Sequence, residues 1–202
     1  MHSGDGDRVT TTGSPHDRPP VRGEVPGESR VFLLLTVFLV GTSAALMSIG
    51  AALISEAAPW GVVSFELSGD AAFAARILAS WSPAAREHAM LSLGLDYLYL
   101  VVYPLWFALA ATRLARRQIG LFAKLGALVA GGSLLSGVFD AFENYGLVRM
   151  LTSGPTETWA RVATACAAAK FSLLSLATLY LVGGLASLGI SRMSGPPRQR
   201  LG

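Results

Sequence analysis

Four long apolar blocks constrain the fold of this chain more than any other feature. They cover about residues 31–54, 91–111, 125–148 and 162–190. A helix needs about 20 predominantly apolar residues to cross the hydrocarbon core of a bilayer, and each block is long enough to do so. Only 14% of the residues are charged, compared with about 25% in soluble domains. The sequence therefore predicts an all-α integral membrane protein, a compact bundle of four transmembrane helices.

The two ends of the chain differ in composition from the apolar blocks. Residues 1–30 are rich in Gly, Pro, Ser, Thr and charge, and show no apolar periodicity. This composition is typical of a disordered tail. Residues 191–202 contain two prolines and also lack a core. We therefore expect one membrane domain at 31–190 with a tail on each side.

The positions of Lys and Arg predict the orientation of the bundle. These residues gather before the first block, between the second and third blocks, and after the fourth, whereas acids balance the arginines of the other two loops. Cytoplasmic loops carry the excess of Lys and Arg. We expect a multi-pass protein of the cell membrane with both tails in the cytoplasm. No basic stripe alternates with aromatic residues, so nucleic acid is not an expected partner despite the net charge of +3.

The long loop between the first two blocks predicts a short extracytoplasmic amphipathic helix. Asp70 is a candidate N-cap, and Phe73, Ile77 and Trp81 recur at intervals of four residues. They form one apolar stripe, so this helix should lie on the membrane surface or cap the bundle. Ser82, followed by a proline, predicts the start of the second transmembrane helix.

Pairs of small residues predict where the transmembrane helices approach one another. Small side chains four residues apart let two helix backbones come close in lipid. The pairs are Gly41 with Ala45, Gly126 with Ala130, and Ser133 with Gly137.

Ionisable side chains inside three of the predicted spans are the main functional signal. The second span holds Asp96, the third holds Asp140, Glu143 and the neutral Asn144, and the fourth holds Lys170. A charge near the middle of the bilayer costs about 2.5–3.5 kcal/mol on insertion scales. All these residues lie toward the extracytoplasmic end of their helices, although the third helix runs opposite to the other two. We therefore expect them to meet at one depth.

The pattern around these residues predicts an acidic pocket that opens outward. Ser133, Ser136, Asp140 and Glu143 share one face of the third helix, and such a polar face should point into the bundle or a water-filled cavity. Tyr99 shares a face with Asp96, and two acids of the preceding loop are candidates to close the pocket. The candidate ligand-binding residues are Asp96, Tyr99, Asp140, Glu143, Asn144, Lys170, Glu66 and Asp70.

Three functions fit this pattern. The first is a pocket that binds or moves a small molecule, a lipid or a cation, with Lys170 as counter-charge. Because four helices are few for a transporter, we expect such a protein to form a homo-oligomer or to bind a membrane partner. The second is a membrane-embedded enzyme that uses Asp140 or Glu143 as a general acid or base on an apolar substrate. The third is a structural or accessory subunit, in which Lys170 pairs with Asp140 or Asp96 to fix helix register.

Motifs of several common enzyme classes are absent from the sequence. It contains no nucleophile elbow, zincin His pair, phosphate-binding loop or dinucleotide fingerprint. The histidines are scattered and the single cysteine is isolated, so a zinc site is not expected. We expect no cofactor, and the sequence leaves open whether the protein is an enzyme.

Overall fold

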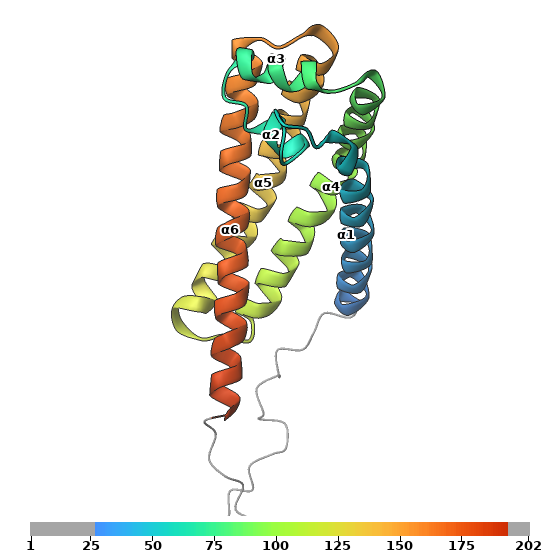
Figure 1. Cartoon of the computed structure of the whole chain (residues 1–202). Helices are drawn as coiled ribbons and strands as arrows, with labels where there is room; N and C mark the ends of the chain where they lie inside the picture. The colour runs from blue at the N-terminus through green and yellow to red at the C-terminus, as the bar shows by residue number, and fades with distance from the viewer. Residues whose placement is uncertain (1–26, 194–202) are drawn as a thin grey trace, which may run out of the picture.

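The computed structural model describes residues 27–193, with side chains to residue 190, and this part of the chain is helical without strands (Figure 1). Four helices are long and apolar enough to cross a membrane. The predicted all-α bundle of four transmembrane helices is therefore confirmed. The helices are α1 (Glu28–Gly50), α4 (Pro83–Ala115), α5 (Gly120–Ser153) and α6 (Glu157–Met193).

Helix α4 begins where the sequence predicts, well before the apolar block itself. The Oγ of Ser82 accepts a hydrogen bond from the backbone N–H of Ala85 at 3.2 Å, and Pro83 occupies the first helical position. This cap satisfies an N–H group that the first turn would otherwise leave unpaired. The extra turns extend α4 toward the connection between α1 and α4.

Helices α4, α5 and α6 form the centre of the bundle, and α1 packs mainly on α4 (Figure 1). At Gly126 a Cβ atom would lie 2.3 Å from the Cβ of Ala115, and at Gly137 it would lie 2.8 Å from the carbonyl oxygen of Leu100. The predicted close approaches at these two glycines are confirmed. At Gly41 nothing lies within 4 Å of such an atom. The predicted close approach is therefore wrong at Gly41, which is exposed, whereas Ala45 of the same pair is half-buried.

Three short elements between α1 and α4 cap one end of the bundle, and we refer to residues 51–81 as the cap. They are η2 (Ala51–Leu53), α2 (Val62–Glu66) and α3 (Ala71–Ser80). Helix α3 is the predicted amphipathic helix, and its predicted N-cap is confirmed because Oδ1 of Asp70 accepts from the N–H of Phe73 at 2.7 Å. The short helix α2 was not predicted.

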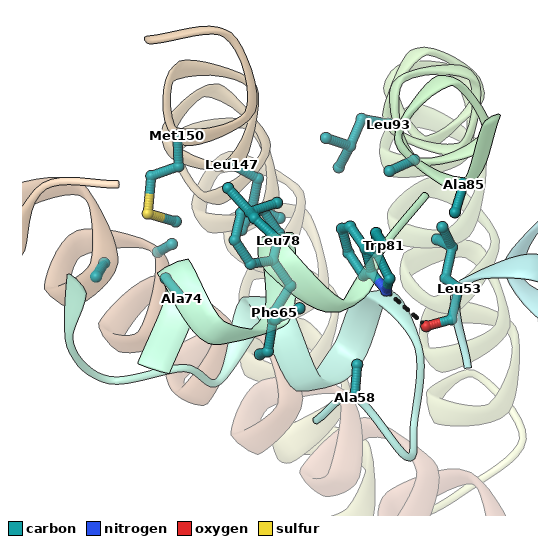
Figure 2. Packing of buried hydrophobic residues seen from close by; sticks show 14 residues of the cluster. Leu53, Ala58, Phe65, Ala74, Leu78, Trp81, Ala85, Leu93, Leu147 and Met150 are labelled. Carbon is teal, nitrogen blue, oxygen red and sulfur yellow. Dashed lines mark hydrogen bonds between the residues drawn. The ribbon is translucent and has the colours of Figure 1, made fainter. Parts of the chain in front are cut away.

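The apolar stripe of the cap is buried against the transmembrane helices. Ile77 is fully buried, and Trp81 is only 4% exposed. The indole N–H of Trp81 donates to the carbonyl oxygen of Leu53 at 2.8 Å, which joins the two ends of the cap (Figure 2). Leu93 of α4 and Leu147 of α5 belong to the same hydrophobic core. The cap therefore closes the bundle rather than lying on its surface.

Candidate functional site

Lys170 of α6 is the centre of a buried group of acidic side chains. Its Nζ donates to Oδ1 of Asp140 and to Oε1 of Glu143, both at 2.8 Å. Both acids lie on α5, with exposed fractions of 2% and 0%, and Lys170 is 6% exposed. The sequence left open whether Lys170 pairs with Asp140 or Asp96. The structure pairs it with Asp140 and also with Glu143.

A third carboxyl group reaches Lys170 from outside the transmembrane helices. Oε2 of Glu66, on α2, lies 3.6 Å from Nζ of Lys170. Glu66 is the last residue of α2, and its side chain is almost completely buried. Figure 1 shows α2 beside α5 and α6, below α3. The cap thus contributes a side chain to the group, as expected for Glu66.

A second polar pair lies between α4 and α5. The side-chain amide of Asn144 donates to Oδ2 of Asp96 in a short hydrogen bond. Asn144 follows Asp140 by one helical turn and is 1% exposed. Hydrogen bonding to an amide satisfies a carboxyl oxygen without adding charge. Together these residues form what we call the Lys170 cluster, which comprises Glu66, Asp96, Asp140, Glu143, Asn144 and Lys170.

The structure places two of the predicted binding residues outside the Lys170 cluster. The hydroxyl of Tyr99 accepts a hydrogen bond at 3.4 Å from Oγ of Ser43 on α1, so Tyr99 joins α4 to α1. Asp70 is exposed and caps α3. The spacing of four between Glu66 and Asp70 does not put them on one helical face, because α2 ends at Glu66 and Gly69 adopts a positive φ of 77°.

Thr164 of α6 positions Glu66, a role for which the sequence contains no signal. The hydroxyl of Thr164 donates to the carbonyl oxygen of Glu66 and accepts from the N–H of Gly69, both at 2.9 Å. Glu157, also on α6, accepts from the N–H of Ala71 at 3.1 Å. These hydrogen bonds attach α6 to the segment of the cap that connects α2 with α3. Only the folded arrangement of the cap reveals them.

The polar face predicted on α5 points into the bundle. Ser133 and Ser136 are fully buried, in line with Asp140 and Glu143. The serine hydroxyls donate to carbonyl oxygens of their own helix, at 2.8 Å to Val129 and 2.6 Å to Ser133. Both serine hydroxyls therefore have hydrogen-bond partners within α5. The charged side chains of this face, Asp140 and Glu143, follow them along the helix.

The acids around Lys170 outnumber the basic groups. Three carboxyl groups lie within 4 Å of one ammonium group. Among the described residues, Oε2 of Glu66 and Oε2 of Glu143 are buried without a hydrogen-bond partner. Burial raises the pKa of Glu66, and the nearby Lys170 opposes this rise. Uncompensated negative charge is costly in a low-dielectric interior, so the arrangement favours bound protons or another positive charge.

Two cavities in the described part of the chain lie away from the Lys170 cluster. One, of about 570 Å³, lies between α1, α4 and α6 near the end opposite the cap. The other, of about 390 Å³, lies between α4 and α5 around Pro104. The cluster itself consists of closely paired side chains. Within residues 27–193 no group of three or more His, Cys, Asp and Glu has an arrangement that would hold a metal ion.

No protein-family model, curated protein sequence or solved structure matches this chain.

Proposed function

We propose that this multi-pass membrane protein binds a cation at the Lys170 cluster, and that this cation is the proton. The observation that carries the proposal is the excess of buried acid, with three carboxyl groups around one ammonium group. If every group were ionised, this part of the cluster would carry two uncompensated negative charges. Two protons remove that imbalance, and the two buried carboxyl oxygens without a partner can hold them.

The cap is the proposed route by which the cation enters and leaves. Glu66 belongs to both the cap and the cluster, whereas the other cluster residues lie on transmembrane helices. The cap is held to α6 by hydrogen bonds from Thr164 and Glu157. A small displacement of α2 would therefore move one carboxyl group away from Lys170 and open the cluster from that end. In the present conformation the site is closed.

We propose the orientation that the charged loops predict, with both termini in the cytoplasm and the protein in the cell membrane. Both described ends of the chain lie at the end of the bundle opposite the cap (Figure 1). Arg113 in the last turn of α4, and Arg116 and Arg117 directly after that helix, lie at the same end. Under the positive-inside rule this end faces the cytoplasm, and the cap faces outward. The cation would then exchange with the extracytoplasmic side.

A structural role is the second candidate, and the short bonds of Lys170 favour it. Two ionic hydrogen bonds of 2.8 Å between α5 and α6 would fix the register of these helices. Catalysis has less support. Asp140 and Glu143, the candidate acids, are both bound to Lys170, and neither lines the two cavities described above.

Cation-dependent stability distinguishes these candidates. The purified protein is unfolded thermally in Na⁺, K⁺ or a bulky organic cation at constant ionic strength and at several pH values. A ligand that binds only the folded protein stabilises it by about 2.7 kcal/mol at 100 times its Kd. We expect a lower pH to raise the Tm in a way that Glu66→Gln and Glu143→Gln weaken, and Na⁺ or K⁺ to raise it no more than the bulky cation does.

The matched control is Glu87→Gln, which removes an exposed acid of α4. This variant should respond to protons and cations as the natural chain does. If Tm responds equally to all cations and to pH in the natural chain and in both cluster variants, the cluster is a structural lock and the proposal is wrong.

A further inference from the structure

Two acids of the Lys170 cluster come from different parts of the fold and meet at the same ammonium group. Glu66 ends α2 of the cap, whereas Glu143 lies on α5. Nζ of Lys170 lies 3.6 Å from Oε2 of Glu66 and 2.8 Å from Oε1 of Glu143. The two carboxyl groups are also within hydrogen-bonding reach of each other. This contact joins the cap directly to the transmembrane helices.

One oxygen of each acid is buried without a hydrogen-bond partner among the described residues. These atoms are Oε2 of Glu66 and Oε2 of Glu143. The exposed fractions of the two residues are 8% and 0%. An ionised carboxyl group only accepts hydrogen bonds, so two ionised groups cannot bond to each other. A proton on either acid makes that group a donor and gives the pair a hydrogen bond.

The charged groups that face this pair from the helices packed against it make two adjacent carboxylates unfavourable. Lys170 of α6 is the one cation of the cluster, and Oδ1 of Asp140 already binds its Nζ at 2.8 Å. Asp96 of α4 is bonded to the neutral Asn144. Helix α3, which packs on α2, contains one charged residue, Arg76, and it is exposed. Two carboxyl groups in one buried site do not both ionise readily, because like charges repel.

We propose that Glu66 and Glu143 share a proton, and that this proton holds the cap closed. The assignment rests on the proposed proton binding at the Lys170 cluster. With two protons bound, both acids are neutral and one donates to the other. After one proton leaves, the remaining proton joins a carboxyl group to a carboxylate, and hydrogen bonds to an ionised acceptor are the strong ones. When the last proton leaves to the solution on the cap side, two carboxylates repel each other and α2 moves away from α5.

Infrared spectroscopy of the purified protein in an ester-free detergent tests whether the proton is shared. The C=O stretching band of protonated carboxyl groups is recorded above about pH 6, where ordinary glutamates, with a pKa of about 4.3, are ionised. We expect Glu66→Gln and Glu143→Gln each to remove the same part of this band, and the double variant to remove no more than either single variant. Independent protonation of the two acids would make the losses additive. That result would overturn the shared proton and leave proton binding at the cluster intact.

Cysteine labelling tests whether this proton holds the cap closed. Ser68→Cys in a Cys166→Ser background places a thiol at a position of the cap that is only 5% exposed. Its labelling rate is divided by that of Ala79→Cys, at an exposed position of α3, to correct for ionisation of the thiol. An opening that releases one proton increases by up to about tenfold for each pH unit. We therefore expect the ratio to rise with pH in the natural background and to stay low with Glu66→Gln.

Glu56→Gln is the matched control for both measurements, because it makes the same replacement at an exposed acid of the same cap. It should leave the infrared band and the labelling ratio as they are in the natural chain. A labelling ratio that does not change with pH in the natural background, where no cluster residue is replaced, overturns the role of the proton in closing the cap. An equal rise with Glu66→Gln does so as well. The proposed function fails separately, if the Tm of the natural chain depends on pH no more than that of the cluster variants.

Discussion

Glu66 is the one residue of the Lys170 cluster that lies on the cap and not on a transmembrane helix. Burial raises its pKa above the ordinary value of 4.5. An acid with a higher pKa in the folded state binds its proton more tightly when the protein is folded. The free energy of unfolding therefore falls as pH rises from 4.5 through the folded-state pKa, and levels off above it.

We predict that Glu66→Gln removes this contribution to the pH dependence. Chemical unfolding of the natural chain and of the variant, measured from about pH 4 to pH 9, should show a smaller loss of stability with rising pH in the variant. Glu87→Gln should retain the full dependence. Superimposable curves for the natural chain and Glu66→Gln would show that this carboxyl group does not titrate differently in the folded state.

At the scale of single helices, the sequence predicted the features that depend only on neighbouring residues, namely the spans and the helix starts. Hydropathy predicted the four spans, and Asp70 and Ser82 marked the starts of α3 and α4 because capping involves only neighbouring residues. Helix α2 was missed because its five residues depend on contacts with other elements. Just before α2, a Cβ atom at Gly61, whose φ is 59°, would lie 3.3 Å from the carbonyl oxygen of Gly50.

The site was predictable in its residues but not in its pairing. Three helices carried charge at one depth, which is visible in sequence, and the structure brings these charges together. Which side chains pair depends on how each helix is rotated about its axis. The spacing of residues along one helix does not reveal that rotation. Lys170 therefore had two candidate partners in sequence, and the participation of Thr164 had no local signature.

The attachment of the cap to α6 leads to a prediction at this scale. Thr164→Val removes two hydrogen bonds to the segment between α2 and α3 while keeping the side-chain shape. Each such bond contributes about 0.5–1.5 kcal/mol. Hydrogen exchange of the amides in residues 62–70 should become faster. Thr152→Val is the control, because that hydroxyl bonds only within α5. Unchanged exchange in Thr164→Val would show that other contacts hold the cap.

For the whole molecule, the orientation of the bundle in the membrane determines whether the cap faces the cytoplasm or the extracytoplasmic side. We predict that single cysteines placed in a Cys166→Ser background will report both termini on the cytoplasmic side. A cysteine at exposed Ala79, on α3, should react with an impermeant maleimide added to intact cells, whereas one at exposed Ile119 should react only after the cells are opened. The reverse labelling pattern would place the cap in the cytoplasm and contradict the proposed direction of exchange.

The bonds between Lys170 and the two acids of α5 also have a consequence for how the chain enters the membrane during synthesis. Helix α5 emerges from the ribosome with Asp140 and Glu143 before Lys170 has been made, and a lone charge near the bilayer centre costs about 2.5–3.5 kcal/mol on insertion scales. The ammonium that offsets these charges arrives 30 residues after Asp140. We therefore expect stable insertion of α5 to depend on α6, with the two helices entering the membrane as one unit. Helix α1 has no charged residue beyond its first turn and can enter lipid alone.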